Sequence, residues 1–159
     1  GCGGAARAIA MTLAFQDAGR IYIHNRTAAK AEELAKEINT QIRSCAEAVD
    51  SLEGQKSTME TCDVLINSTS LGMHPHEDAL PLEPSLISPN LIVADIVYNP
   101  LMTKLLKTAE SKGCAVVHGL GMLIYQGAAA FKLFTGVDPL VDEMSNAAHS
   151  LMAEKQQNS

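Results

Sequence analysis

The sequence predicts a doubly wound α/β domain, in which a mainly parallel sheet is covered by helices on both faces. Short segments that are apolar almost throughout alternate with longer amphipathic segments, as in parallel strands joined by crossover helices. A glycine-rich stretch opens the chain. Asn25-Arg26-Thr27 follows this stretch by about 20 residues, which is the distance at which such folds place the residue that contacts the adenosine ribose.

Composition supports one domain and argues against two kinds of partner. The chain has 159 residues, 47% of them hydrophobic, which is enough to bury one core of ordinary size. Its net charge of −6 and isoelectric point near 5.3 argue against a nucleic acid or an anionic membrane. No apolar segment has the length of a membrane span. The four scattered cysteines are expected to be reduced, buried thiols in the cytoplasm.

The first half of the chain predicts two helices with strands between them. A helix is expected over 5–17, with apolar positions at Ala8, Ile9, Leu13 and Phe15. A second helix over 28–38, capped by Thr27, places on one face Ala31, Leu34, Ala35 and Ile38. Strands are expected at 20–24, around 41–45 and at 63–67, and the pattern over 46–61 is ambiguous between a helical turn and a loop.

The second half begins with a long connection, 68–90, that is rich in proline, histidine and acidic residues. Segment 91–97 is the most strand-like of the chain, and another strand is expected at 114–117. Helices are expected over 102–112, 120–134 and 139–154. The polar tail 155–159 is expected to be frayed.

The glycine-rich stretch Gly1-Cys2-Gly3-Gly4-Ala5-Ala6 fits the pattern G-x-G-x-x-A. The first glycine permits a tight turn, the second lets the backbone approach a pyrophosphate, and the small third residue allows close packing of helix on strand. The following helix would point its free N–H groups at the phosphates. Such a loop should follow a β-strand, so we expect a strand before Gly1 and regard the chain as a piece of a longer protein.

Arg26 indicates which nucleotide is bound. An acidic residue at this point of the fold bonds the ribose 2′-hydroxyl of NAD, whereas an arginine accommodates the 2′-phosphate of NADP. Lys30 would add a second positive charge one helical turn later. The alternative is that Thr27 is only a helix cap and that Arg26 and Lys30 belong to a solvated face.

Three more motifs stand where strands end or a helix begins, at the edge where open α/β sheets bind ligands. They are Asn67-Ser68-Thr69-Ser70-Leu71-Gly72-Met73, Asp95-Ile96-Val97-Tyr98-Asn99-Pro100 and Gly119-Leu120-Gly121-Met122-Leu123-Ile124-Tyr125-Gln126. The first suits either a ligand crevice or an ordinary polar turn. Tyr98 offers a hydroxyl for a hydroxylated substrate. Asp95 suits either a catalytic role or, as is more usual for an aspartate in an apolar strand, a bond to nearby backbone or a helix N-terminus. Gln126, in an apolar segment, needs a partner in the core or a substrate. His74-Pro75-His76 lacks the further ligands of a metal site, so no metal is expected.

Taken together, these motifs resemble the C-terminal, NADP-binding domain of the shikimate dehydrogenase family, in its order and spacing. Asp95-Ile96-Val97-Tyr98-Asn99-Pro100 is followed in that pattern by Thr103. The resemblance implies a Rossmann fold and an NADPH-dependent, reversible reduction of 3-dehydroshikimate to shikimate in aromatic amino-acid biosynthesis. It also implies that the N-terminal domain of the same protein, absent here, carries the lysine and aspartate of proton transfer. No catalytic residue is therefore assigned to this chain.

The resemblance assigns binding roles to individual residues. At the pyrophosphate it implies Gly1, Cys2, Gly3, Gly4 and Ala5, and at the adenosine 2′-phosphate Asn25, Arg26, Thr27 and Lys30. Along the cofactor and at the nicotinamide it implies Thr69, Ser70, Ile96, Gly119 and Met122. The residues that would reach the small-molecule substrate are Tyr98 and Gln126. A homodimer is a possible assembly.

Three alternatives remain open from the sequence. A quinate/shikimate dehydrogenase that uses NAD or NADP is similar around 99–106. A non-catalytic nucleotide-binding module would keep the glycine loop and Arg26 but would not need Tyr98 or Gln126. A methyltransferase would normally have an acidic residue near position 25, and none is present.

Overall fold

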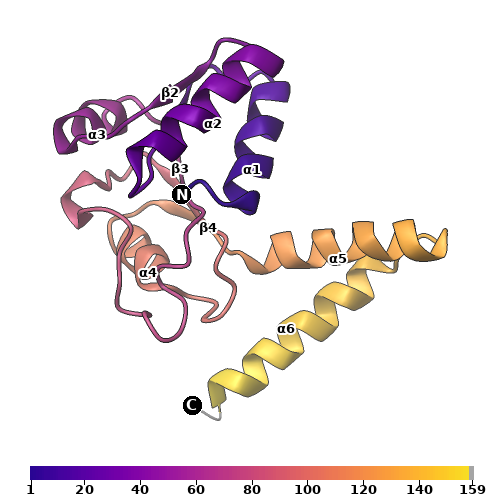
Figure 1. Ribbon diagram of the computed structural model, residues 1–159. Helices are drawn as coiled ribbons and strands as arrows, with labels where there is room; N and C mark the ends of the chain where they lie inside the picture. Colours follow the sequence, from indigo (N-terminus) through magenta and orange to yellow (C-terminus); the bar gives the residue numbers. More distant parts are fainter. Residues whose placement is uncertain (158–159) are drawn as a thin grey trace.

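The computed structural model describes residues 1–157 and alternates helices with short strands (Figure 1). The helices are α1 (Gly4–Phe15), α2 (Ala28–Gln41), α3 (Leu52–Met59), α4 (Lys104–Ser111), α5 (Leu120–Thr135) and α6 (Val141–Gln157), with a 3-10 turn at Pro84–Leu86. The strands are β1 (Ile21–Ile23), β2 (Ala46–Ala48), β3 (Val64–Asn67), β4 (Ile92–Asp95) and β5 (Ala115–Val117). Each strand pairing is parallel, which confirms the α/β class predicted from the alternating pattern.

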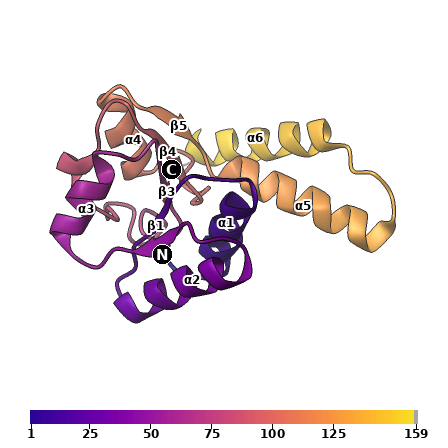
Figure 2. The ribbon, with the colours of Figure 1, turned by 90° about the horizontal axis from the view of Figure 1, so that it is seen from above.

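The strands form a two-stranded and a three-stranded sheet instead of one continuous sheet. In the first sheet β1 pairs with β2, so that Ile21 lies opposite Ala46. In the second the order is β3-β4-β5, and Asn67 lies opposite Asp95 at the carboxyl ends. Helices α1 and α2 accompany the first sheet, and α4 packs on β4 and β5 at the other end of the molecule (Figures 1 and 2).

The division between the two sheets is a groove that separates β1 from β3. The cavity has a volume of about 760 Å³, and both strands line it along their whole lengths. Its remaining walls are mostly apolar and include Ile9, Leu13, Leu34, Met59 and Leu82. The edges of β1 and β3 that face this groove therefore carry no strand partner within the described residues.

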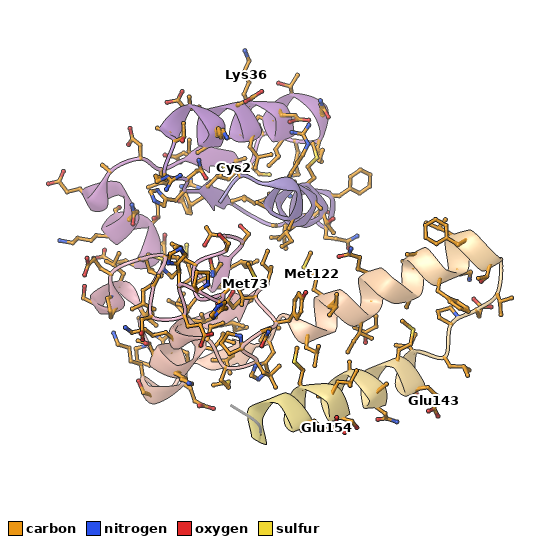
Figure 3. All side chains as sticks on the ribbon, turned by 60° about the horizontal axis from the view of Figure 1, so that its bottom comes forward. Cys2, Lys36, Met73, Met122, Glu143 and Glu154 are labelled. Carbon is orange, nitrogen blue, oxygen red and sulfur yellow. The ribbon has the colours of Figure 1, made fainter. Side chains whose placement is uncertain are left out.

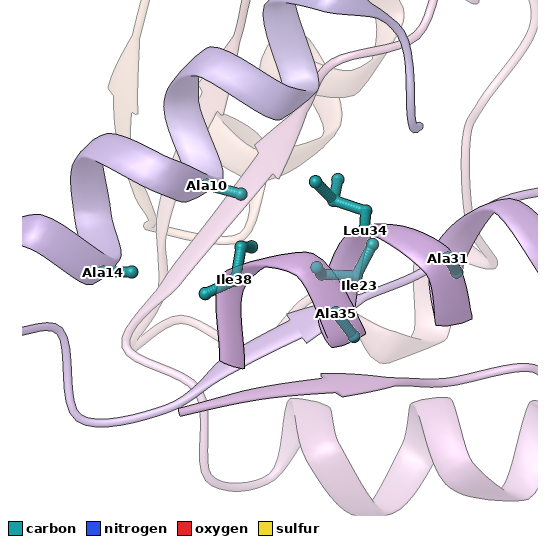
Figure 4. Close-up of a cluster of buried hydrophobic side chains, with 7 residues drawn as sticks. All are labelled: Ala10, Ala14, Ile23, Ala31, Leu34, Ala35 and Ile38. Carbon is teal, nitrogen blue, oxygen red and sulfur yellow. The ribbon is translucent and has the colours of Figure 1, made fainter. Parts of the chain in front are cut away.

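The first core lies between α1, α2 and β1 (Figure 4). All four α2 residues predicted to share a face are buried, including Ile38 at 0% exposure. The prediction for α1 is wrong in part: its buried positions are Ala6, Ala10 and Ala14, whereas Phe15 is 75% exposed. Small alanines let α1 approach β1 and α2 closely, and the larger Ile9 and Leu13 line the groove instead.

A second core lies under α4. Its buried members are Ile87, Leu91, Val93, Leu105, Leu106, Ala109 and Cys114. All four cysteines are free, as expected, but only Cys114 is buried. Cys2, Cys45 and Cys62 are half-buried, so the prediction of buried thiols is wrong for these three.

Several element boundaries differ from the prediction around 41–61. Helix α2 continues to Gln41, and the next strand is Ala46–Ala48 rather than 41–45. Asn39 accounts for this shift, because its side chain accepts from the N–H groups of Cys45 and Ala46 and donates to the carbonyl of Ala46. The ambiguous segment contains α3, capped by the Ser51 hydroxyl, which accepts from Gly54 N.

The two C-terminal helices form a hairpin that projects from the rest of the molecule (Figures 1 and 2). Helices α5 and α6 contact each other, and large apolar side chains near their junction are exposed, among them Leu133 at 83% and Phe134 at 88%. Helix α6 extends to Gln157, so the predicted frayed tail begins no earlier than Asn158. Asn158 and Ser159 lie outside the described residues.

Candidate functional site

The glycine loop lies between the carboxyl ends of β1 and β3. The amino group of Gly1 donates to the carbonyl of His24, just after β1, at 2.7 Å. A Cβ at Gly1 would lie 2.8 Å from the carbonyl oxygen of Ser68, just after β3. Only glycine allows this approach, so the sequence requirement at position 1 has a structural cause.

The start of α1 has the properties of a phosphate site. Gly3 is the N-cap, no side chain caps the helix, and its first turn contains no acidic residue. A Cβ at Gly3 or Gly4 would meet nothing within 4 Å, so no distant part of the chain crowds these two residues. Uncapped N–H groups and the positive end of the helix dipole favour an anion there. The residues present therefore fit a pyrophosphate.

Two cations follow the end of β1, where the carbonyl of His24 bonds Gly1. Arg26 and Lys30 are exposed, and neither forms an ion pair within the part of the chain that the structure describes. Thr27 is the N-cap of α2, as predicted, although its side chain makes no capping bond, and Asn25 Nδ2 donates to the carbonyl of Thr27. Burial raises the pKa of the Cys2 thiol, while the nearby charges of the amino terminus and Lys30 act in the opposite direction. The charge of Lys30 therefore acts on Cys2 in the glycine loop.

The turn after β3 lies against the same loop. Thr69 Cγ2 would be 3.0 Å from a Cβ at Gly1. The Thr69 hydroxyl is already used within the turn, because it donates to Asn67 Oδ1 at 2.7 Å and accepts from Leu71 N. Ser70 is exposed and has no such bond among the described residues. Of the two predicted cofactor residues, Ser70 has the free hydroxyl.

Gly119 lies between β5 and α5 in the chain and packs against the segment that follows β4. It is the N-cap of α5, and a Cβ there would lie 2.4 Å from the carbonyl oxygen of Ile96 and 2.6 Å from that of Val97. No larger residue fits without moving backbone. Ile96 and Gly119, which were both predicted to border the nicotinamide, are therefore in close contact.

Tyr98, Met122 and Gln126 are exposed near this junction. Tyr98 is 41% exposed, and Met122, on the first turn of α5, is 36% exposed. In the view of Figure 3, the side chain of Met122 extends from α5 toward the part of the molecule that contains Cys2. Gln126 lies one turn later and is exposed, so a core hydrogen bond, one of its two predicted roles, is wrong.

Asp95 is buried and bonded, as its position in an apolar strand predicts. Its carboxylate accepts from Val97 N, Asn67 Nδ2 and Thr103 Oγ1. Burial raises the pKa of Asp95, and the three hydrogen bonds lower it only in part. Sequence reasoning missed Asn67 as a partner, although a polar residue at the end of an apolar strand is the signal that could have indicated it.

Two kinds of feature are missing from the described residues. Histidine, cysteine and carboxylate side chains nowhere gather in threes as a metal site would need, and His74 lies only near Glu77. Within residues 1–157 no helix combines the length and apolarity needed to cross a membrane.

Family models match both ends of the chain. The model described as shikimate/quinate 5-dehydrogenase matches residues 1–76, and the shikimate 5′-dehydrogenase C-terminal domain matches residues 119–149. A shikimate dehydrogenase (NADP(+)) of Methanosarcina barkeri is 47% identical over 91% of this chain and 51% of its own length. The chain thus spans about half the length of the curated relatives it matches.

Solved structures show the same fold. A quinate dehydrogenase from Corynebacterium glutamicum in complex with NAD matches with a TM-score of 0.86 and 32% identity, over 94% of this chain and 53% of that one. A shikimate dehydrogenase in complex with NADP+ matches with a TM-score of 0.83 and 40% identity, over 96% of this chain and 53% of that one. By sequence and by fold, the chain belongs to the shikimate/quinate dehydrogenase family, and the resemblance drawn from its motifs is confirmed.

Proposed function

We propose that this chain is the NADP-binding part of a shikimate dehydrogenase, which reduces 3-dehydroshikimate reversibly to shikimate with NADPH in aromatic amino-acid biosynthesis. The observation that carries the proposal is a pair of exposed cations without ion pairs among the described residues, Arg26 and Lys30, which follow His24, whose carbonyl bonds Gly1 of the glycine loop. A helix N-terminus binds a phosphate without regard to the nucleotide, whereas an exposed guanidinium at the end of β1 matches a 2′-phosphate.

The chain's own residues would hold the cofactor along the carboxyl edge of the strands. In this proposal Gly1, Cys2, Gly3, Gly4 and Ala5 hold the pyrophosphate, and Asn25, Arg26, Thr27 and Lys30 hold the adenosine 2′-phosphate. Thr69, Ser70, Ile96, Gly119 and Met122 border the rest of the cofactor. The open space at Gly3 and Gly4 and the exposure of Arg26 and Ser70 support these assignments.

The bound cofactor would supply a hydride, and the chain's residues would orient the reactants. Tyr98 and Gln126 are proposed to reach the substrate, because both are exposed, Tyr98 two residues after Ile96 and Gln126 on the helix that begins after Gly119. No residue of this chain is given a part in proton transfer. The lysine and aspartate for that step are expected in the other half of the protein.

The comparisons support NADP but leave a second candidate. One structural relative is a quinate dehydrogenase in complex with NAD, so quinate and NAD are the nearest alternatives. Arg26 favours NADP, because NAD has no 2′-phosphate to meet its charge. A non-catalytic nucleotide-binding module is the remaining alternative.

Titration of the chain with NADPH and NADH, followed by the fluorescence of the nicotinamide, tests the cofactor. We expect NADPH to bind more tightly, by at least the factor of about tenfold that one charge-assisted hydrogen bond contributes. Equal affinities would refute the 2′-phosphate argument. The chain alone is expected not to oxidise shikimate, and turnover by the purified chain would refute our placement of the proton-transfer residues.

We also infer that residues 1–159 form one Rossmann domain, and that in the full-length protein a further parallel strand before Gly1 lies in the groove between β1 and β3. The groove supports this inference, because both strands turn an unpaired edge to it and Ile9 and Leu13 line it. Gly1 lies at the carboxyl ends of both strands, so residues before it would run parallel to them. One strand there would join the two sheets into one.

Fusion of a six-residue Val/Ile segment directly before Gly1 tests this inference, with a Gly/Ser segment of the same length as the control. Only the apolar segment should raise the free energy of unfolding and slow amide exchange in β1 and β3, because it alone pairs with their edges and fills the groove. Equal behaviour of the two fusions would refute the added strand.

The remaining partners follow from the same proposal. An N-terminal domain of the same protein would cover exposed apolar side chains of α5 and α6, such as Tyr125 and Leu151. A homodimer remains an expectation, as does a cytoplasmic location. Each is testable once the full-length protein is purified, by its mass in solution and by fractionation of the cells that make it.

A further inference from the structure

Three polar side chains at the edge of the second sheet are almost inaccessible to solvent. Asn67, Asp95 and Thr103 are 3%, 2% and 0% exposed, and they are the buried polar residues of the described chain. They come from different places: the end of β3, the end of β4 and the N-cap of α4. Burying polar groups costs free energy unless they bond one another, so their meeting needs an explanation.

The Asp95 carboxylate is the centre of this cluster. Oδ1 accepts from Asn67 Nδ2 and from Val97 N, both at 3.0 Å, and Oδ2 accepts from Thr103 Oγ1 at 2.8 Å. No cation pairs with it in the part of the chain described here. The three donors, Asn67, Val97 and Thr103, belong to different segments of the chain. The carboxylate therefore holds these three segments in place relative to one another.

Asn67 extends the cluster into the turn after β3. Its Oδ1 accepts from Thr69 N at 3.1 Å and from Thr69 Oγ1 at 2.7 Å, and its Nδ2 also donates to the carbonyl of Leu71. The backbone from Thr69 to Leu71 is thus tied to the same side chain that contacts Asp95. The turn carries the two residues proposed to lie along the cofactor, Thr69 and Ser70.

Thr103 extends the cluster in the other direction. Its hydroxyl donates to Asp95 and accepts from Leu106 N at 3.3 Å, which caps α4. Gly72 lies over this point with a φ of 93°, and a Cβ on it would be 3.4 Å from Thr103 Cβ. The left-handed glycine lets the turn close over the buried bonds.

We propose that Asp95 is a positioning residue that holds the turn after β3 and the segment after β4 in one fixed arrangement around the nicotinamide half of NADP. It acts through Asn67 on Thr69 and Ser70, and through Val97 N on the backbone between Ile96 and Tyr98. The roles of those residues rest on the proposed function above. The hydrogen bonds themselves do not.

Thr103 gives the cleanest variants, because its hydroxyl is the donor to Oδ2 and lies away from the proposed cofactor contacts. Thr103→Val replaces the hydroxyl by a methyl group of similar size and leaves Oδ2 without that donor. Thr103→Ser keeps the hydroxyl and serves as the conservative rescue. Ala109→Gly is the control for general weakening of α4, since Ala109 is buried in the same helix and takes no part in the hydrogen bonds to Asp95.

Binding of two ligands separates positioning from simple loss of stability. NADPH carries both halves of the cofactor, whereas adenosine 2′,5′-bisphosphate carries only the half proposed to contact Arg26. Thr103→Val should weaken NADPH binding by up to about tenfold, which is the most that the loss of one hydrogen bond within the protein would transmit to the ligand, and should leave the affinity for the bisphosphate within about twofold. Thr103→Ser and Ala109→Gly should leave the ratio of the two affinities unchanged.

Amide exchange measures the arrangement without any ligand. In Thr103→Val the amides of Thr69, Leu71 and Val97 should exchange faster, whereas in Ala109→Gly only those of α4 should. An unchanged affinity ratio, or unchanged exchange at these three amides, would overturn the positioning role. If the unaltered chain binds neither ligand, the proposed function fails instead, and the exchange result alone decides on the Asp95 arrangement.

Discussion

The two ends of the candidate site treat their polar groups in opposite ways. After the end of β1, Arg26 and Lys30 are exposed and form no ion pair in the described chain. At the ends of β3 and β4, Asn67, Asp95 and Thr103 are buried and bond one another. The polar groups at the first end are free to bond a ligand, whereas those at the second end bond one another.

This difference follows from the cost of burial. An exposed cation keeps its water until a ligand replaces that water, so it can remain unpaired at little cost. A buried polar group without a partner costs about 1–3 kcal/mol, so groups that fix the backbone must satisfy one another. In the described chain no buried side-chain nitrogen or oxygen lacks a partner. We therefore expect substitutions at the first end to change ligand affinity, and substitutions at the second to change stability as well.

The largest effect is expected at Gly119, where the second end depends on a close backbone approach. In Gly119→Ala the new methyl group would lie 2.4 Å from the carbonyl oxygen of Ile96, so backbone must move. The free energy of unfolding, measured by urea denaturation, should fall by about 2–3 kcal/mol, the upper part of the usual cost of overpacking.

Gly121→Ala is the matched control for this prediction. Gly121 lies in the first turn of the same helix, and a Cβ there would meet nothing within 4 Å. Its replacement should be neutral or stabilise the chain by up to about 1 kcal/mol, because alanine favours a helix. Equal losses in the two variants would mean that the contact with Ile96 does not restrict position 119.

A smaller effect, confined to binding, is expected at the first end. Arg26→Ala should weaken NADPH binding by about 10- to 100-fold, the value of one or two hydrogen bonds to a charged group. NADH binding should be unchanged, because NADH has no 2′-phosphate. The free energy of unfolding should change by less than about 0.5 kcal/mol, as is usual for an exposed residue without partners.

Arg26→Lys separates charge from geometry at this position. Lysine keeps the positive charge but cannot bond a phosphate with two parallel N–H groups, so it should restore part of the affinity. A parallel loss of NADPH and NADH affinity in Arg26→Ala would contradict a 2′-phosphate contact. It would also remove the contrast between the two ends, since Arg26 would then support the site as a whole.

The contrast also separates what the sequence could predict from what it could not. The first end could be proposed from the sequence because each of its signals is a short motif that can be recognised by itself: the glycines at 1–4, and Arg26 with Lys30 one helical turn later. The α2 face and most strand positions followed from apolar spacing for the same reason. The roles of the site residues stay predictions until a ligand is bound.

The missed features depend on side-chain hydrogen bonds and on packing, which the spacing of apolar residues does not reveal. Asn67 contacts Asp95 across 28 positions, and a single polar residue at a strand end does not identify its partner. Asn39 sets the start of β2 through side-chain bonds, which periodicity does not register. The exposure of Phe15 and the division of the sheet at the groove likewise depend on what packs against α1 and β1 in three dimensions.

The smallest effect concerns the charge of Asp95, and it tests whether burial or hydrogen bonding dominates at the second end. Burial raises the pKa of Asp95 above the value of about 3.9 expected in the unfolded chain, in spite of three hydrogen bonds. Between those two values the folded chain binds more protons than the unfolded chain. The stability that Asp95 contributes is therefore present at low pH and is lost as the pH rises through its folded-state pKa.

Asp95→Asn replaces the carboxyl group by an amide that does not titrate. Urea denaturation of the unaltered chain and of this variant between pH 4 and 8 measures the difference in their free energies of unfolding. The stability of the unaltered chain relative to Asp95→Asn should fall as the pH rises from about 4, and should level off above the folded-state pKa. The slope cannot exceed about 1.4 kcal/mol per pH unit, because one carboxyl group exchanges at most one proton. A relative stability that rises with pH would mean that the bonds from Asn67, Val97 and Thr103 outweigh desolvation. The buried end would then hold a charge at a net gain, and the contrast with the exposed cations would rest on access to solvent alone.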